Sequence, residues 1–199
     1  MKGWDYRSSA GSVASTIAFE WAERVNRILQ KVYINQGEKD QVQNTKDLAA
    51  KARPKELLDP LKATIDDLTQ RFGTWNKPWG EINRFQRSTG KITEKYVDSA
   101  ASIPVGFGSA LWGQLPSFRS SRFETNKRYG FSGNSFVCAV EFGKRIKAKS
   151  ILAGGNSGDP SSKHFNDQAL MYSKGQFKDV LFYKEDVLKH VERNYHPGE

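Results

Sequence analysis

The sequence predicts an α+β protein, because helical, irregular and strand-like patterns follow one another along the chain. Apolar residues recur every three or four positions in the first third. Residues 74–133 are rich in Gly, Pro, Trp and Phe without clear periodicity, and an alternating run then covers Ser135–Phe142. We therefore expect a mainly helical part over 1–73, an irregular, aromatic-rich part over 74–133, and strands with short helices over 134–199.

Two amphipathic helices are predicted in the first third. The first covers residues 12–32, where Ser12 or a nearby serine can supply the N-cap oxygen. A polar break is expected at Gly37. The second helix begins at Pro54, which suits a first helical turn, and ends before Gly73, which suits a left-handed C-cap. The apolar positions of the first helix are Val13, Ile17, Trp21, Val25 and Ile28.

The clearest strand is Ser135–Phe142, whose residues are largely apolar on both faces, so we expect burial on both sides. The single cysteine, Cys138, lies in this run and is expected to be a small buried hydrophobe. Lys149–Ala153 is the predicted hairpin partner. Gly154–Pro160 is the predicted turn that leaves the sheet. Three short elements should follow: a helix over 166–173 ended by Gly175, a strand over 180–183 and a helix over 185–193.

Composition and charge limit the classes of function. Of 199 residues, 37% are hydrophobic and 27% are charged, which suits one domain or a large piece of a bigger one. No apolar run approaches the ~20 residues that span a bilayer, and the residues after Met1 lack the apolar core of a signal peptide. We therefore expect no membrane partner.

The net charge of +9 is spread evenly along the chain. Lys and Arg number 17 against 13 Asp and Glu in residues 1–100, and 14 against 9 in residues 101–199. The densest basic cluster, Lys144–Lys149, lies between two strand-like runs, so a solvated turn is favoured over a nucleic-acid site. We expect no nucleic-acid partner. The alternative function from another class is a non-catalytic basic interaction module that binds protein or nucleic acid.

The turn after the hairpin contains the residue types of a catalytic triad, namely Ser157, His164 and Asp167. A nucleophile elbow requires Gly-x-Ser-x-Gly, and Asp159 occupies the place of the last glycine. Triads are also assembled from separated loops, since three side chains must converge on one atom. We therefore do not expect a self-contained serine hydrolase.

Metal and phosphate sites are also disfavoured by spacing. His164 and Asp167 could be joined by His190 and His196, yet no HExxH or CxxC pattern is present, so structural roles are favoured. The glycines of the turn could form a phosphate-binding nest, but they lack the lysine of a P-loop. These glycines are Gly154, Gly155 and Gly158.

Three segments together resemble the end of penicillin-acylase-family β chains: Gly133–Gly143, Ser150–Pro160 and His164–Gln168. The second contains a G-[QN]-S-G turn, and the third is an H-[YF]-x-D-Q helix start. Upstream, Gly3–Ser9 resembles the L-x-x-W-D segment of the family, and Trp79–Arg84 resembles its W-G-E-x-N-R segment. The motif positions, which we expect to be structural, are Trp4, Asp5, Trp79, Gly80, Asn83, Asn134, Ser135, Phe136, Ser157, Gly158, His164, Asp167 and Gln168.

The resemblance covers essentially the whole chain and implies the C-terminal portion of a four-layer αββα N-terminal-nucleophile hydrolase. Family members cleave the amide bond of N-acyl compounds, such as β-lactams or acyl-homoserine lactones. The implied partners are the remainder of the parent β chain, its α chain and a small-molecule N-acyl substrate. A periplasmic or secreted location also follows from the family. No cofactor is expected in this chain, and calcium is possible only in the parent enzyme.

In this family the nucleophile is a serine freed as the first residue of the β chain, whose own amino group acts as the base. Here the first residue is Met1, so the nucleophile and the oxyanion asparagine are expected upstream, and this chain should contain no catalytic residue. Gly108 and Ser109 imitate the cleavage junction, but they follow segments that belong late in the β chain. We expect the isolated chain to be an inactive scaffold whose hairpin completes the central sheets of the parent.

Overall fold

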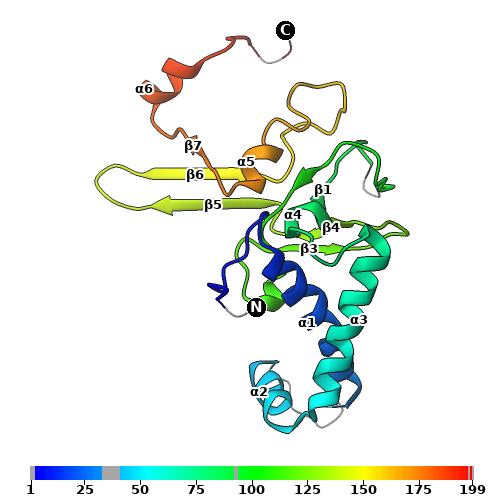
Figure 1. Ribbon diagram of the computed structural model, residues 1–199. Coiled ribbons are helices and arrows are strands. Elements are labelled where there is room, and N and C mark those ends of the chain that lie inside the picture. The colour runs from blue at the N-terminus through cyan, green and yellow to red at the C-terminus, as the bar shows by residue number, and fades with distance from the viewer. Residues whose placement is uncertain (1–2, 33–40, 92–93, 197, 199) are drawn as a thin grey trace.

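The computed structural model of the chain describes all residues except 1–2, 33–40, 92–93, 197 and 199. The fold is α+β, as predicted (Figure 1). Three helices occupy one end, a four-stranded sheet lies in the middle, and a three-stranded sheet extends from the other end. The long helices are α1 (Val13–Val32), α2 (Gln41–Lys51) and α3 (Pro54–Phe72).

Both predicted helices are confirmed, with their caps. The backbone N–H of Ser15 donates to Ser12 Oγ over 3.1 Å, which places the N-cap of α1 where the sequence predicts it. Helix α3 ends at Gly73, whose φ of 74° is left-handed and whose N–H donates to the Thr69 carbonyl. The two helices pack against each other and bury their apolar faces, so their periodicity was a reliable signal.

Helix α2 was not predicted from the sequence. It is short and mostly polar, and Leu48, which contacts Val25 of α1, is its buried apolar residue. A single buried apolar residue creates no periodic pattern in the sequence, so the helix could not be predicted. A helix of this kind is stabilised by packing against the rest of the fold rather than by its own sequence. The predicted break at Gly37 lies outside the described residues.

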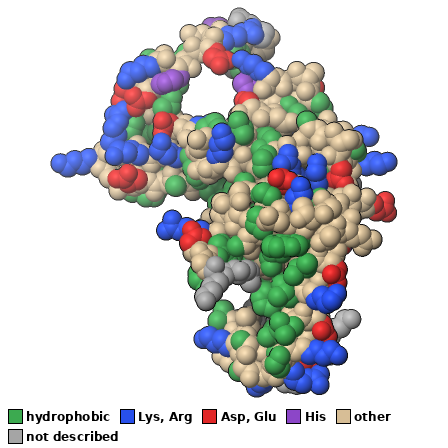
Figure 2. Space-filling model, viewed as in Figure 1, with side chains coloured by type: hydrophobic (Ala, Val, Ile, Leu, Met, Phe, Trp, Pro, Cys, Tyr) green, Lys and Arg blue, Asp and Glu red, His purple; other side chains and the backbone are tan. Residues whose placement is uncertain are grey.

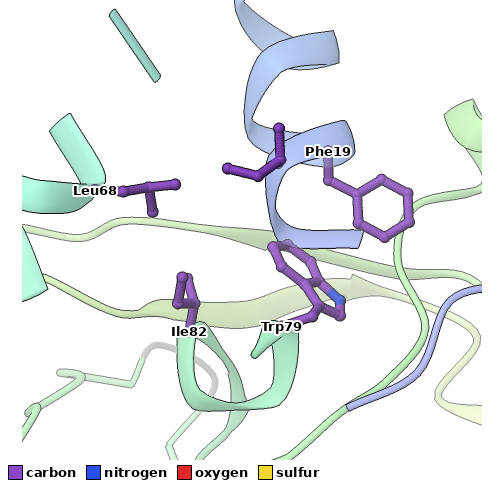
Figure 3. Packing of buried hydrophobic residues seen from close by; sticks show 5 residues of the cluster. Phe19, Leu68, Trp79 and Ile82 are labelled. Atoms are coloured by element: carbon purple, nitrogen blue, oxygen red, sulfur yellow. The ribbon is translucent and has the colours of Figure 1, made fainter. Parts of the chain in front are cut away.

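The largest helical cluster joins α1 and α3 to the short helix α4 (Trp79–Ile82). Figure 3 shows Phe19, Leu68, Trp79 and Ile82 converging at this point. Leu68 and Ile82 are fully buried, and each such side chain stabilises the fold by roughly 1.5–3 kcal/mol. The nitrogen-bearing edge of the Trp79 indole faces away from Leu68 and Ile82, on the side of Phe19 (Figure 3).

The prediction that residues 74–133 are irregular is wrong in one respect, because this stretch contains a sheet. Its strand order is β2-β1-β4-β3, with β1 parallel to β4 and the other pairs antiparallel. These strands have two to six residues, too short for alternation to stand out. The strands are β1 (Asn83–Phe85), β2 (Ile103–Pro104), β3 (Phe118–Ser121) and β4 (Arg128–Gly133); the 3-10 turn η2 (Ala110–Trp112) precedes β3.

Buried charges connect this sheet to the helices. Arg128 of β4 donates to Glu20 over 3.1 Å and to Glu23 over 2.5 Å, both on α1. Arg71 of α3 pairs with Glu20 at 3.4 Å and with Asp67 at 2.8 Å. The side chains of Arg128, Glu20 and Arg71 are only 6–8% exposed, so water screens these ion pairs little.

The predicted hairpin is confirmed, but its predicted burial is wrong. Strand β5 (Phe136–Glu141) pairs antiparallel with β6 (Lys147–Leu152), and β7 (Lys178–Val180) forms the other edge. Phe136 is 58% exposed, and Cys138 is exposed rather than buried. Apolar residues on both faces predict cover on both faces, and the part of the chain that the structure describes supplies cover only near the base of the hairpin, where Val137 packs against the cluster of Ile151 and Tyr172.

The C-terminal elements are shorter than predicted. Helix α5 (Ala169–Ser173) begins three residues late, and Gly175 follows it with a left-handed φ of 64°, as expected. Strand β7 overlaps the predicted strand over 180–183 only at Val180. The predicted helix over 185–193 is the single turn α6 (Lys184–Val187) followed by the 3-10 turn η3 (Leu188–His190). Among the described residues, none of the helices combines the length and the apolar character that crossing a bilayer requires.

We predict that Arg128→Ala lowers the free energy of unfolding by about 3 kcal/mol, because it leaves buried carboxylates short of a partner. Urea denaturation monitored by circular dichroism measures the loss. Arg145→Ala is the matched control, since Arg145 also pairs with two carboxylates but is half exposed, and it should change stability little. Equal losses in the two variants would contradict a special role for the buried network.

Acid should weaken the same network through Asp67. Burial raises the pKa of this carboxyl, but Arg71, Arg122 and Arg24 outweigh that effect and hold the pKa below its ordinary value of 3.8. Asp67 therefore contributes stability that is present above its unfolded-state pKa and is lost as pH falls through the lower folded-state pKa. The unfolding free energy should fall less from pH 6 to pH 2 in Asp67→Asn than in the parent chain; parallel pH profiles would contradict this.

Candidate functional site

Residues 154–168, between β6 and α5, contain five of the thirteen predicted motif residues, and Arg87 holds this segment in place. The Arg87 guanidinium donates to the Phe165 carbonyl over 2.6 Å and to the Ser157 carbonyl over 2.9 Å. It also lies 4.1 Å from the centre of the Phe165 ring. Sequence reasoning missed Arg87, because its partners are backbone carbonyls about 70 to 78 positions away, which leave no trace in the local pattern.

The structure brings together two of the three triad residue types. His164 Nδ1 lies 2.8 Å from Asp167 Oδ2. The Ser157 hydroxyl oxygen instead accepts a hydrogen bond from the Asp159 backbone N–H over 3.1 Å, and the Ser157 N–H donates to the His164 carbonyl. The hydroxyl thus stabilises a local turn, as Ser side chains commonly do. The side chains of His164 and Asp167 are 47% and 37% exposed, which does not provide the dry surroundings of a catalytic centre.

Gln168 and Gly155 show why this segment needs its motif residues. The Gln168 side chain is buried, and its Oε1 accepts from the Leu152 N–H over 3.1 Å, at the end of β6. Its backbone N–H donates to the Gly154 carbonyl. A Cβ at Gly155 would lie 2.1 Å from the His164 carbonyl oxygen, a distance that no folded backbone tolerates. Only glycine permits this approach.

Neither a metal site nor a phosphate nest is supported among the residues described. No group of three His, Cys, Asp or Glu side chains is placed to hold a metal there. His190 Nδ1 lies 3.0 Å from the Asp186 carbonyl oxygen, close to its own turn, and His196 is exposed in the C-terminal segment. A nest alternates right- and left-handed backbone. None of Gly154, Gly155 and Gly158 has a left-handed φ.

The W-G-E-x-N-R segment forms a second structural centre, apart from the turn. Asn83 is fully buried, and its Nδ2 donates to the carbonyls of Val105 and Phe107 over 2.8 and 3.0 Å. The Gly80 N–H donates to the Ala10 carbonyl over 2.7 Å, and a Cβ at Gly80 would lie 2.7 Å from Ala10 Cβ. Asn83 thus connects the start of β1 to the segment after β2, and Gly80 holds α4 against the segment before α1.

The remaining motif residues also make local or packing contacts. Trp4 Nε1 donates to the Arg7 carbonyl over 3.0 Å, and Asp5 Oδ1 accepts from the Arg7 N–H over 2.9 Å. The Asn134 side chain accepts from the Ser117 N–H, which joins the ends of β3 and β4. The Ser135 carbonyl accepts from the Ala153 N–H at the base of the hairpin.

Tyr172 of α5 reaches the same region and donates its hydroxyl to the Asn134 carbonyl over 3.0 Å. Burial raises the pKa of Tyr172 to about 12, so the hydroxyl stays protonated and remains a donor at neutral pH. Sequence reasoning missed this link, which connects α5 to the turn between the two sheets. Phe136, in contrast, projects into solvent at the start of β5.

The imitation of a cleavage junction at Gly108 and Ser109 lies in ordinary packed structure. The Ser109 hydroxyl caps the turn η2 by accepting from the Leu111 N–H over 3.2 Å, and the Gly108 carbonyl accepts from the Phe118 N–H over 2.7 Å. Both contacts are structural.

The family model described as Penicillin amidase matches residues 1–189. The chain belongs to the penicillin amidase family. Two curated relatives are acyl-homoserine lactone acylases named PvdQ. That of Pseudomonas syringae pv. syringae (strain B728a) is 27% identical over 126 residues, and that of Pseudomonas savastanoi pv. phaseolicola (strain 1448A / Race 6) is 25% identical over 126 residues. Each match covers 63% of this chain and 15% of the relative, so the chain spans only a small part of their length.

In this member of the penicillin amidase family, ion pairs neutralise most of the basic cluster Lys144–Lys149. Arg145 pairs with Glu185 and Asp186, and Lys149 pairs with Asp179 over 3.0 Å. Figure 2 shows acidic side chains among the basic ones around the β5–β6 hairpin. These ion pairs argue against this cluster as the centre of a basic interaction module.

We predict that Gly155→Ala lowers the free energy of unfolding by about 1–3 kcal/mol, because the added methyl overlaps the His164 carbonyl. Gly158→Ala is the matched control: nothing lies within 4 Å of a Cβ built there, and its backbone is not left-handed. Thermal and urea unfolding of both variants checks the difference. A destabilisation at Gly158 equal to that at Gly155 would contradict the close approach as the cause.

Proposed function

We propose that this chain is the C-terminal scaffold of the β chain of an acylase that hydrolyses the amide bond of N-acyl compounds. The whole protein would use a β-lactam or acyl-homoserine lactone type of substrate in a periplasmic or secreted setting. This part of the proposal rests on the family and on the two acyl-homoserine lactone acylases that the chain resembles. The nucleophile and the oxyanion donors would belong to other parts of the parent, and no cofactor is proposed for this chain.

One observation carries the scaffold assignment: the polar side chains of Asn83, Ser157 and Gln168 form hydrogen bonds with the protein's own backbone. Asn83 and Gln168 are buried; Asn83 donates to backbone carbonyls just after β2, and Gln168 accepts from a backbone N–H at the end of β6. The Ser157 hydroxyl is bonded within its turn rather than to the His164 ring. An activated serine requires a base within hydrogen-bond reach, and the described residues place none at Ser157.

The exposed hairpin supports the same assignment. Strand β5 is an edge strand, and its apolar residues include Phe136 at 58% and Val140 at 45% exposure. A long apolar edge left in water invites pairing with another strand. We infer that the remainder of the parent β chain covers this edge and these faces, so that β5 and β6 complete a sheet of the four-layer fold. Burying such side chains would supply much of the energy of assembly.

The purified 199-residue chain should not hydrolyse a chromogenic acyl-anilide. Intact mass spectrometry must first show a single polypeptide near 22.5 kDa, so that no other chain contributes activity. In the full parent enzyme, Ser157→Ala should leave kcat/KM unchanged, because the hydroxyl only caps a turn. Turnover that coelutes with the lone chain and disappears in Ser157→Ala would overturn the proposal.

A further inference from the structure

A pocket of about 220 Å³ lies between α1, α4 and the β3–β4 strand pair, and no function above uses it. Its inner walls are aromatic: Phe19, Trp79 and Phe118 are each less than 9% exposed. Phe19 and Trp79 pack with ring centres 5.0 Å apart. Trp112 and Phe131 add two more aromatic rings to the lining.

The size suits a single small ring. Apolar cavities of ~150 Å³ bind benzene, so 220 Å³ leaves room for a benzene-sized ring with a short polar substituent. Aromatic walls favour such a ring through offset and edge-to-face contacts. The pocket is open to solvent on one side, so a polar substituent can remain at the mouth.

The charges around the pocket specify the sign of that substituent. Arg128 lines one wall but is committed to Glu20 and Glu23. Arg27 and Arg119 also line the pocket, are exposed, and form no ion pair with any carboxylate among the described residues. Glu23, the single carboxylate among the lining residues, is already paired. The mouth therefore has uncompensated positive charge.

Arg119 is placed to present its charge at the aromatic wall. Its guanidinium carbon lies 5.3 Å from the centre of the Phe131 ring, so the side chain lies along that ring. A guanidinium offers a planar pair of N–H donors that matches a carboxylate. We propose that this pocket binds a small aromatic carboxylate, with the ring against Phe19 and Phe118 and the carboxylate bonded to Arg119.

Arg27 adds positive charge to the pocket lining from α1, where its Nε donates to the Glu23 carbonyl over 3.4 Å. This binding site is independent of the proposed acylase function, because it needs neither the nucleophile nor any other part of a parent enzyme. Its ligand class follows from the combination of an aromatic interior with an unpaired arginine at the opening.

Gly108 offers a position from which a larger side chain can fill the pocket. A Cβ there would lie 3.6 Å from the nearest Phe19 ring carbon, which is an ordinary contact, and the backbone is not left-handed. The methyl groups of Gly108→Val would therefore occupy the space next to Phe19. Gly143→Val is the matched control, because Gly143 lies in the hairpin turn and a Cβ there meets only Arg145 O, at 3.9 Å.

The test is a titration of the full 15N-labelled chain, followed by NMR through its indole N–H signals. Benzoate supplies a ring and a charge, benzyl alcohol supplies only the ring, and acetate supplies only the charge. Trp79→Phe assigns the Trp79 signal; Trp75, which does not line the pocket, serves as an internal control. Benzoate should shift the Trp79 signal saturably with a Kd on the order of 1 mM, and the other two probes should bind at least about tenfold more weakly.

The variants locate the site. Arg119→Gln should weaken benzoate binding by about tenfold, and Gly108→Val should abolish it. Arg193→Gln removes the same charge from an arginine that also lies over an aromatic ring, Tyr195, outside the pocket, and should leave binding unchanged. The proposal would be overturned by benzyl alcohol binding as well as benzoate, by unchanged binding in Arg119→Gln or Gly108→Val, or by a Trp75 shift equal to that of Trp79.

Discussion

The ion pair between Arg128 and Glu20 is the interaction on which the rest of the structure depends, because it joins residues 108 positions apart. Burial alone would lower the pKa of Arg128, but Glu20 and Glu23 more than reverse that effect and raise it, so the guanidinium stays charged inside the fold. Buried charges are costly unless their partners are correctly placed. The pair therefore requires α1 and β4 to meet in one arrangement, and it discriminates against others.

A second arginine performs a similar task at the other end of the molecule. Arg87 follows β1 and holds the segment over 154–168 through two carbonyls and one ring. Both arginines come from the stretch over 74–133, which separates the helices from the hairpin in sequence. The stretch with the least regular pattern thus provides the contacts that bring the two ends of the chain into one structure.

This arrangement explains why the family motifs are structural in this chain. Gly155 permits a close backbone approach, Asn83 binds two carbonyls of the segment after β2, and Gln168 binds the N–H at the end of β6. Such demands fix residue identity as strictly as catalysis does. The exposed strand β5 is the complementary feature, since its composition fits an interior that the described residues do not form.

The sequence by itself determined the elements whose signals are local. The periodicity of α1, the glycine cap of α3 and the alternation of β5 depend on neighbours a few residues away, and the family followed from motifs in fixed order. Tertiary structure alone decided the sheet of short strands, the role of Arg87, the bonding of the Ser157 hydroxyl and the exposure of β5. These four features depend on contacts between distant segments or on the presence of a covering layer. Neither kind of dependence produces a periodic pattern in the sequence.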